Sequence, residues 1–594
     1  MHDTMNELTQ HSPFGGQLVL ETVAGTTSGK LNPENDVEVA QGVDRTMYVY
    51  VPGSGVPHAK QGQVLMVLRD EATRESALDL MGRLGLARLA EERHFILLFP
   101  NPEEGGWNYD RTASRDDDTQ FLVRCFAALK GSKGGVAGFN GMIYHLGATP
   151  AGSAMALTLA GVSPLDAAAV MVGATPEGYV LPDSSAEQVA WLYEPNAQVE
   201  SHLEQVNKPA GSVVWRGVTV HTNADNPNVR YFVSDGGLTA ETVADAWERM
   251  FSTTRRWRND TYGTYQPRID FTDRGFVAHV HDTSLGLDDG IARTWYEYVP
   301  ARLRGTTQPV PLVFFLHGIN CVALYSAEQS GWADLADRDG FIVVFPDPAI
   351  EERWNVWDDP RIPSDVTFIR ALIDHMQDVH PIDTTRVYLS GFSMGSMFSN
   401  ALACSYPELF AGAVACNGPS MGYLQTLDES VPGMLMFRRN SVVGHLPATD
   451  ATVPPTRRLA DAKKAAFDYR MPFVQFVGLL DGVGLAPGKV WPATEESDSL
   501  WKDDVSYWLG YDNVPGDLAY TDTNELGYAA DKVTRQGRFV HLAWESADEG
   551  QPELFHLVGL ARMPHAVDLE AIDKGWQFVR QYRRNPDGSL GKVE

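Results

Sequence analysis

The chain has few cysteines and few basic residues for its length, and each shortage excludes a class of protein. Its 594 residues include 4 cysteines, and these show no CxxC pair or other metal-ligand spacing, so neither a disulfide scaffold nor a zinc finger is predicted. Lysine and arginine number 48 against 77 aspartates and glutamates, which gives a net charge of −29. This balance argues against nucleic acid and anionic lipid as partners, because both attract basic faces.

Two further absences concern membranes and export. No apolar run approaches the roughly 20 residues that cross a bilayer. The first residues, MHDTMNELTQHSPFGG, lack the basic n-region and apolar h-region of a secretory leader. We therefore expect a cytoplasmic protein, or a secreted one if a leader has been removed. Cys125, Cys321, Cys404 and Cys416 are expected to be buried free thiols, with a Cys321–Cys404 disulfide as the less favoured alternative.

What the chain does contain is a strand–turn–helix motif with a serine at the turn. Residues 386–397 read RVYLSGFSMGSM, in which an apolar run leads into Gly391-Phe392-Ser393-Met394-Gly395 and then into helix-compatible residues. This order is typical of a nucleophile elbow, where flanking glycines leave room for a strained serine. Ser393 would be the nucleophile, and the N–H of Met394 would help to hold an oxyanion. By itself the pentapeptide also fits an ordinary glycine-rich turn.

A second segment predicts the other half of an oxyanion hole. Leu312 to Leu316 form a short apolar run of the kind found in strands buried on both faces. The run ends at His317-Gly318, the position at which an α/β-hydrolase places its second oxyanion donor. We expect the backbone N–H of Ile319 to be that donor, with Gly318 allowing close approach of the substrate. The alternative is a plain strand-to-loop turn.

Two later strand ends supply the remaining members of a Ser-His-Asp triad. The run from Met471 ends at Asp481, and His565 lies between a predicted strand and a closing helix. His565 is predicted to be the general base and Asp481 the acid that orients it, in the chain order expected for this fold. Weaker alternatives exist for both roles: His445, His541 and His556 for the base, and Asp503 and Asp504 for the acid.

These motifs together resemble the esterase family of polyhydroxybutyrate depolymerases and feruloyl esterases within the α/β-hydrolases. The resemblance spans roughly residues 270–590 and includes WNVWDD at 354–359. It implies that Trp354 and Trp357 lie beside the cleft and that His317 and Gly318 contact the substrate. Ile319 stands where many relatives have cysteine. Met394-Gly395-Ser396 is bulkier than the usual sequence, so the family's substrate is not carried over.

The first half of the chain repeats the plan of the second. RTMYVYVP at 45–52 corresponds to RTWYEYVP at 293–300, and LAEERHFILLFP at 89–100 corresponds to LADRDGFIVVFP at 335–346. The offset between matching residues stays between 246 and 248, so a whole domain has been duplicated in tandem. We predict two α/β-hydrolase-like domains, 1–262 and 263–594, each with a mostly parallel sheet between helices. Lid-like insertions are expected near 418–470 and 484–540.

The catalytic positions of the first copy are degenerate. Aligning its helix with that of the second copy places Pro150 over Ser393, and Arg69-Asp70 replaces His317-Gly318. Proline offers neither a nucleophile nor an N–H donor. Asp225 is interpreted as a remnant of the acid. We found no matching histidine, although His279 and His281 lie near the junction. The copy is therefore predicted to be a pseudo-enzyme that packs against the active domain; covering the active cleft or binding a polymer are the alternatives.

The predicted function is hydrolysis of carboxylic esters through an acyl-enzyme, with no metal or organic cofactor. The resemblance implies short acyl esters, hydroxyalkanoate oligomers or hydroxycinnamoyl esters as substrates. A serine peptidase or an acyltransferase of the same fold is the alternative, and a non-catalytic binding protein is a third interpretation. The expected partner is a small or oligomeric ester; homo-oligomerisation stays open.

Overall fold

The chain folds into two compact units, residues 1–269 and 270–594. The computed structural model describes residues 16–25, 42–53, 63–112, 114–132, 142–268, 274–319, 321–350, 353–419, 426–427, 435–436, 454–482, 490–495, 500–548 and 551–593. A hairpin of β11 (Thr254–Trp257) and β12 (Thr264–Pro267) crosses the boundary predicted after residue 262. It belongs to the first unit, where the Tyr265 hydroxyl accepts the Val189 N–H at 3.1 Å.

The second unit is built on a mixed sheet whose central strands are parallel. Parallel pairing joins β16, β15, β17, β18, β21 and β24 in that order, and antiparallel strands complete both edges. The ten strands, in spatial order, are β13 (Val277–Asp282), β14 (Arg293–Tyr298), β16 (Ile342–Asp347), β15 (Val310–Leu316), β17 (Ile382–Phe392), β18 (Gly412–Cys416), β21 (Phe473–Gly478), β24 (Phe555–Leu560), β23 (Phe539–Ala543) and β22 (Lys532–Gln536).

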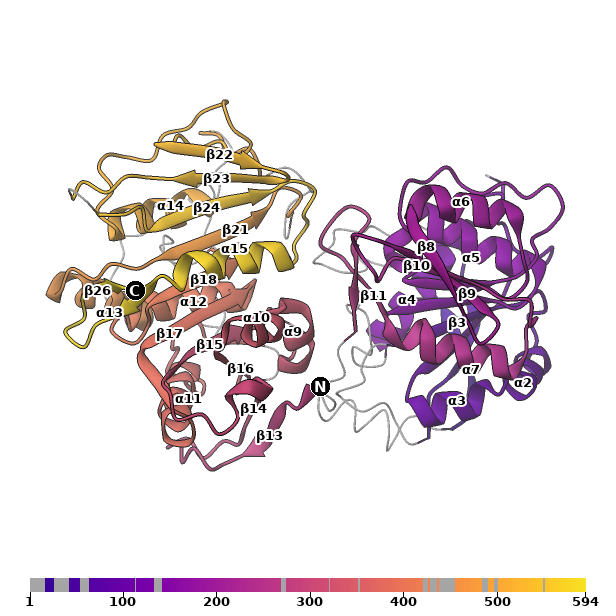
Figure 1. Ribbon diagram of the computed structural model, residues 1–594, viewed down its shortest axis with the longest axis horizontal. Coiled ribbons are helices and arrows are strands. Elements are labelled where there is room, and N and C mark those ends of the chain that lie inside the picture. Colours follow the sequence, from indigo (N-terminus) through magenta and orange to yellow (C-terminus); the bar gives the residue numbers. More distant parts are fainter. Residues whose placement is uncertain are drawn as a thin grey trace. The chain divides into compact units, whose positions relative to one another are not determined.

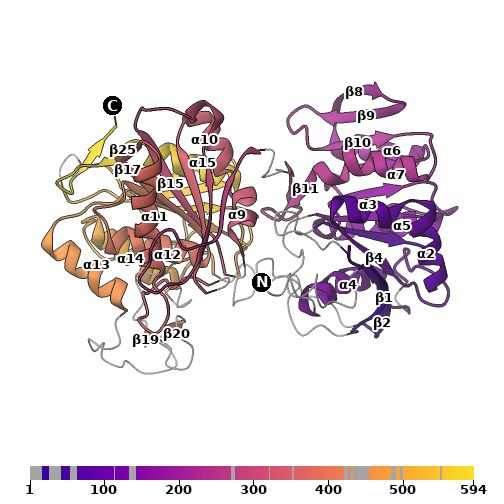
Figure 2. The same cartoon turned by 90° about the horizontal axis from the view of Figure 1, so that it is seen from below.

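Helices cover both faces of this sheet, as expected for parallel strands joined by crossover helices. Figure 2 shows α10 and α15 on one side, and α12, α13 and α14 on the other. The described helices of this unit are α9 (Ala323–Ser330), α10 (Trp332–Asp339), α11 (Asp365–Val379), α12 (Met394–Ser405), α13 (Pro455–Ala466), α14 (Leu500–Tyr511) and α15 (Leu569–Val579). A small hairpin, β25 (Tyr582–Arg584) and β26 (Leu590–Lys592), follows α15.

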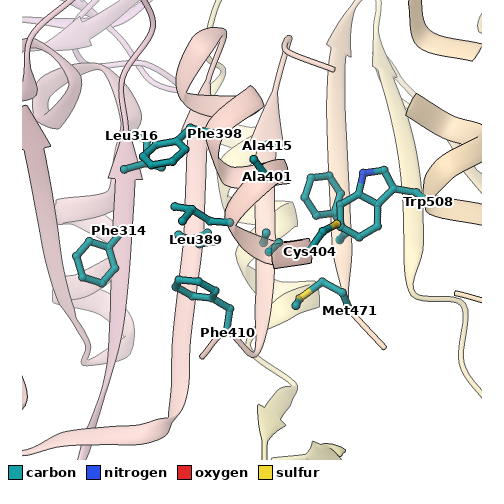
Figure 3. Packing of buried hydrophobic residues seen from close by; sticks show 14 of the residues in the cluster. Phe314, Leu316, Leu389, Phe398, Ala401, Cys404, Phe410, Ala415, Met471 and Trp508 are labelled. Atoms are coloured by element: carbon teal, nitrogen blue, oxygen red, sulfur yellow. The ribbon is translucent and has the colours of Figure 1, made fainter. Parts of the chain in front are cut away.

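The largest apolar core lies between the central strands and α12, directly beneath the segment that carries Ser393. Leu316, Leu389 and Phe398 belong to this core, and Figure 3 shows them together with Trp508 of α14. Buried apolar side chains on strands and helix hold the two elements in fixed register. The turn that joins β17 to α12 is therefore anchored at both ends.

The first unit repeats this topology strand for strand. Its sheet has the same spatial order and the same parallel centre as the second sheet. Figure 1 shows the two units in different colours, the first in indigo to magenta and the second in red to yellow. The strands, in spatial order, are β1 (Leu18–Val23), β2 (Arg45–Tyr50), β4 (Ile96–Pro100), β3 (Val64–Leu68), β5 (Ile143–Gly147), β6 (Ala169–Val172), β7 (Ala190–Leu192), β10 (Arg230–Val233), β9 (Val218–Asn223) and β8 (Pro209–Trp215). The helices are α2 (Arg74–Arg83), α3 (Leu86–Arg93), α4 (Asp118–Ser132), α5 (Pro150–Val162), α6 (Ala197–Asn207) and α7 (Ala240–Arg249). Both units are α/β-hydrolase-like, which confirms the predicted fold class.

The predicted insertions are only partly described by the structure. In the first, β19 (Thr426–Leu427) and β20 (Leu435–Met436) pair, and α13 packs on α12. The second includes α14, whose Trp508 is fully buried and donates its indole N–H to Oδ1 of Asn400 at 2.8 Å. It also includes β22, an edge strand of the main sheet. The described parts of the second insertion therefore belong to the domain body.

Two predictions about the whole chain can be compared with the described residues. All four cysteines are free and buried, so the alternative Cys321–Cys404 disulfide is not formed. Within the described ranges, no helix combines the length and apolar character that a bilayer crossing requires.

Candidate active site

Ser393 occupies a strained turn between β17 and α12. Its backbone has φ 55° and ψ −119°, a combination that residues with a Cβ rarely adopt. The Ser393 N–H donates to the carbonyl oxygen of Cys416 at 2.9 Å, which ties the turn to the neighbouring strand β18. Met394 is the first residue of α12, and N–H groups of a first helical turn have no acceptor within the helix. The segment has the geometry predicted for a nucleophile elbow.

Three glycines make this turn sterically feasible. A Cβ at Gly391 would lie 2.2 Å from the carbonyl oxygen of Gly395, and a Cβ at Gly395 would lie 2.0 Å from that of Leu316. A Cβ at Gly418, in the loop after β18, would lie 2.1 Å from the Ser393 carbonyl oxygen. Backbone atoms cannot move aside to accept such contacts. The spacing of Gly391 and Gly395 around Ser393 is thus set by close backbone packing.

His565 and Asp481 form a close pair at the ends of adjacent strands. Nδ1 of His565 lies 2.7 Å from Oδ2 of Asp481. Asp481 follows β21 and His565 follows β24; these strands are parallel and paired, so both loops leave the same edge of the sheet. The His565 side chain is 6% exposed, and its ring centroid lies 4.9 Å from that of Phe392, the residue before Ser393. The structure thus brings the imidazole to the elbow.

Asn417 is a structural member of the site that the sequence did not reveal. Its side-chain amide donates to the carbonyl of Ala566 at 2.7 Å, and its Oδ1 accepts the N–H of Gly478 at 2.7 Å. One residue therefore connects the strand that precedes Asp481 to the loop that carries His565. Asn417 itself has φ 54°, a conformation that asparagine tolerates better than most residues. The sequence signal that could have drawn attention to Asn417 is its place in ACNG, directly after the buried strand β18.

The loop after β15 lies against the elbow, as an oxyanion loop requires. A Cβ at Gly318 would come within 3.1 Å of Cβ of Ser393, so this glycine sits directly beside the serine. Ile319 follows in the same loop and is partly exposed. Asp347 fixes the loop beyond it: its Oδ1 accepts the N–H of Ala323 at 2.6 Å. The backbone around Ile319 is therefore held next to Ser393.

His317 supports this loop from inside the protein. Its side chain is 1% exposed; Nδ1 lies 2.8 Å from the carbonyl oxygen of Gly318, and Nε2 lies 3.3 Å from Oδ1 of Asp347. The His317 carbonyl accepts the indole N–H of Trp354 at 2.8 Å. An imidazole held in this way positions the backbone and has little surface left to touch a substrate.

The two tryptophans predicted beside the cleft are packed in the core. Trp354 is 1% exposed and Trp357 is 2% exposed, and both belong to the main hydrophobic cluster. In this conformation neither indole is available to a substrate. Their burial follows from the segment running beneath the elbow, where Trp354 contacts Phe398 of α12 with ring centroids 5.3 Å apart.

The alternative catalytic residues do not join the pair. His541 and His556 face each other on β23 and β24 with ring centroids 4.6 Å apart, and burial lowers the pKa of His556 to about 3. Asp503 and Asp504 lie within α14, and Asp504 is fully buried. His445 lies outside the described residues.

The first unit keeps the scaffold of the site. The indole of Trp107 donates to the carbonyl of Arg69 at 2.9 Å, just as Trp354 donates to that of His317. Tyr144 packs edge-on against Trp247 of α7, as Tyr388 packs against Trp576 of α15. These matched contacts show that the corresponding elements pack in the same way in both copies.

The turn that corresponds to the elbow is one residue longer in the first unit. Gly152 follows Gly147 by five positions and packs on the Leu68 carbonyl, whereas Gly395 follows Gly391 by four and packs on the Leu316 carbonyl. The helices therefore pair Pro150 with Ser393, as predicted. The residue that caps the helix is Thr149.

Thr149 supplies a hydroxyl that the sequence alignment overlooked. It has an ordinary extended backbone, with φ −138°, so the longer turn has lost the strain of the elbow. Its hydroxyl donates to Oδ1 of Asp70 at 2.6 Å and accepts the N–H of Gly152 at 3.0 Å. The hydroxyl is used as a helix cap.

A glycine stands at the position of the base in the first unit, and the proposed remnant of the acid lies elsewhere. Thr239 caps α7 as Asp568 caps α15, so counting three residues back places Gly236 where the second unit has His565. Asp225 follows β9, which runs antiparallel to β10, and the aspartate therefore lies at the opposite edge of the sheet. Asp225 is not a remnant of the acid. His279 and His281 lie on β13 of the second unit.

Comparison with known proteins finds that the elbow segment is similar to esterases. Residues 296–459 match the family model described as esterase PHB depolymerase. This confirms the resemblance over a shorter range than predicted. The range contains Ser393 and Ile319 but ends before Asp481 and His565.

Three relatives each match about a quarter or less of the chain. Over 145 residues it is 32% identical to a bifunctional acetylxylan esterase/xylanase of Neocallimastix patriciarum, covering 24% of this chain and 21% of the relative. It is 33% identical over 130 residues to a poly(3-hydroxyalkanoate) depolymerase of Paucimonas lemoignei, covering 21% and 30%. It is 30% identical over 142 residues to a feruloyl esterase of Thermothelomyces thermophilus, covering 23% and 48%. The chain thus spans less than half the length of each.

Proposed function

We propose that the second unit is a serine hydrolase that cleaves carboxylic esters through an acyl-enzyme. The observation that carries this proposal is the combination of a serine at φ 55° with a His565–Asp481 pair 2.7 Å apart beside it. Three glycines leave room for the strained backbone of Ser393. An ordinary helix N-terminus does not need this strain, so it points to a functional role. The match of residues 296–459 to an esterase family supports the ester as the bond attacked.

In the first half of the reaction, Ser393 attacks the ester carbonyl carbon. Nε2 of His565 takes the hydroxyl proton, because Nδ1 faces Asp481 and carries the other proton. The carboxylate of Asp481 fixes this tautomer and stabilises the imidazolium that forms. The imidazolium then returns the proton to the leaving alcohol, and the acyl group stays on Ser393.

In the second half, water takes the place of the alcohol. His565 accepts a proton from the water as it attacks the acyl carbon, and the proton passes to Ser393 when the acid leaves. In both halves the tetrahedral oxyanion is assigned to the N–H groups of Met394 and Ile319. The first lies at the start of α12, and the second lies in the loop that Gly318 brings against Ser393.

The substrate class is proposed from the relatives, whose names include acetylxylan, poly(3-hydroxyalkanoate) and feruloyl esters. Short acyl esters, hydroxyalkanoate oligomers and hydroxycinnamoyl esters are therefore the candidates. We assign no chemistry to the first unit, since Thr149 is relaxed and Gly236 stands where the second unit has its histidine.

The test is hydrolysis of a panel of nitrophenyl acetate to octanoate, methyl ferulate and a hydroxybutyrate trimer, by wild type and Ser393→Ala. Ester turnover that falls by at least about 10³-fold in the variant is expected from loss of the nucleophile. Thr149→Ala is the matched control and should hydrolyse the panel like wild type. Folded wild-type protein that cleaves no ester but cleaves the corresponding amides would contradict the proposal.

A further inference from the structure

A second cluster of reactive side chains lies outside the triad, on elements that carry none of its residues. His279 is on β13, Glu297 is on β14 and His375 is on α11. One donor atom from each lies within 4.8 Å of the other two. Nε2 of His279 is 3.0 Å from Oε1 of Glu297, and Nε2 of His375 is 3.5 Å from the same oxygen.

The two separations between Glu297 and the histidines match those of a tetrahedral metal site. Zn²⁺ binds imidazole nitrogen and carboxylate oxygen at about 2.0–2.1 Å, so two ligand atoms of a regular tetrahedron lie about 3.3 Å apart. The observed 3.0 and 3.5 Å bracket that value. Among the described residues, Nε2 of His279 is buried and has no hydrogen bond of good geometry despite its closeness to Glu297. A buried ring nitrogen that is close to a carboxylate oxygen but makes no hydrogen bond with it could be satisfied by a cation shared with that oxygen.

The groups around the three donors hold them in the orientation a metal needs. Nδ1 of His279 lies 3.4 Å from Oδ2 of Asp282, which leaves Nε2 as the free donor, in the carboxylate–histidine arrangement common at zinc sites. The His279 ring stacks on Trp295, with centroids 4.3 Å apart. Nε2 of His380 lies 3.2 Å from Oε2 of Glu297. Oε1 accepts the indole N–H of Trp295 at 3.1 Å, and a carboxylate oxygen has a second lone pair for a metal ion.

Glu297 is an acidic residue on a buried strand of the sheet, a position that does not need an acidic side chain to fold. Its side chain is 5% exposed. Imidazole nitrogens of three histidines and the indole N–H of Trp295 surround its carboxylate.

The first unit shows that the same scaffold folds without these donors. Sheet register pairs Glu297 with Val344 on β16 and Val49 with Leu98 on β4, so Val49 is the counterpart of Glu297. Asp365 and Asp118 both open the helix that follows, and ten residues further on stand His375 and Ala128. Valine and alanine fill the two positions in the first unit. The polar cluster is thus a specific feature of the second unit.

We propose that His279, Glu297 and His375 bind Zn²⁺ or a similar divalent transition metal. Three protein donors leave a fourth position for water or an anion. The two histidine side chains are 22% and 23% exposed, so an ion can enter from solvent. A bound cation would link β13, an edge strand, to β14 and α11, which predicts stabilisation of this edge of the sheet.

The test is a titration of tag-free, full-length protein with Zn²⁺ after treatment with a chelator. We compare wild type with His375→Ala and Glu297→Val, which copy the first unit, and with His541→Ala, which removes a histidine elsewhere. Wild type and His541→Ala should each bind one more Zn²⁺ than His375→Ala and Glu297→Val do, and this ion should raise Tm. Co²⁺ in place of Zn²⁺ should give the visible bands of a four-coordinate site. In His375→Ala and Glu297→Val this affinity should fall by at least about 100-fold.

Circular dichroism of the metal-free variants checks that both remain folded. The proposal is overturned if wild type binds no Zn²⁺, or if the affinity of His375→Ala and Glu297→Val equals that of His541→Ala. The Co²⁺ spectrum of wild type gives an answer that depends on no variant. An octahedral spectrum, or none, would likewise contradict the three-donor site.

Discussion

The strain at Ser393 can be measured by comparing two substitutions that both remove the hydroxyl. Ser393→Ala keeps a Cβ at φ 55° and ψ −119°, whereas Ser393→Gly removes the steric conflict. Non-glycine residues in such regions carry about 1–3 kcal/mol of strain. Glycine gives back about 0.5–1 kcal/mol through the greater freedom of the unfolded chain. We therefore expect Ser393→Gly to be more stable than Ser393→Ala by about 0.5–2 kcal/mol, with both variants inactive.

The first unit offers a matched control for this comparison. Thr149 also caps the helix after the central strand, but its φ is −138°, so its Cβ is not strained. The difference between Thr149→Gly and Thr149→Ala measures the preference for glycine at an unstrained cap. The excess of the Ser393 difference over the Thr149 difference isolates the strain of the elbow.

Differential scanning calorimetry of the four variants is the assay, because it can resolve the transitions of two units in one chain. For the 270–594 unit, 1 kcal/mol corresponds to a shift of about 1–2 °C in Tm. Ser393→Gly should therefore melt up to about 3 °C above Ser393→Ala. Equal melting temperatures, or the same difference at both positions, would refute the claim that the turn is strained.

Three further predictions address the rest of the site and its support. Asp481→Asn should lower kcat by about 10³–10⁴-fold with little change in KM, measured by ester hydrolysis, because the tautomer of His565 would no longer be fixed; an effect confined to KM would argue for a binding role. Gly418→Ala should abolish activity and lower the free energy of unfolding, measured by denaturant titration, by about 2 kcal/mol or more, because the new Cβ would lie 2.1 Å from the Ser393 carbonyl oxygen. Gly510→Ala, whose Cβ would meet nothing within 4 Å, should be neutral or stabilising in the same titration. Burial raises the pKa of Asp512 to about 7, so its protonated form favours folding and this contribution is lost as pH rises. Between about pH 4 and 7, the free energy of unfolding of wild type should therefore fall by about 4 kcal/mol relative to that of Asp512→Asn. A difference between the two proteins that stays constant with pH would contradict this.

The elbow could be predicted from sequence because its requirements are local. Gly391 packs on Gly395 within one strand–turn–helix unit, Gly395 packs on the adjacent strand β15, and the spacing of both glycines around Ser393 can be read from the sequence. The partnership of Asp481 and His565 followed from the order of strands in a parallel sheet. Duplication was also visible, because the two copies keep nearly constant offsets over whole strands.

The features that were missed depend on contacts between distant segments. Asn417 joins the segments that carry Asp481 and His565; its place after a buried strand is visible in the sequence, but its two distant partners are not. Trp354 was predicted to face the cleft, yet its indole turns inward to the carbonyl of His317. The extra turn residue beside Thr149 appears only when sheet register and helix packing are compared. Such registers are decided by packing, which the sequence pattern does not record.

The central claim is that Ser393 is the nucleophile of an acyl-enzyme. The most direct measurement is labelling with a fluorophosphonate followed by peptide mass spectrometry of the adduct, in wild type and in His565→Ala. We predict one adduct, on Ser393 within residues 386–397, formed in wild type and strongly reduced in the variant, because His565 activates the serine. A folded wild-type protein that carries no adduct, or carries it on Thr149 or another residue, would contradict the account.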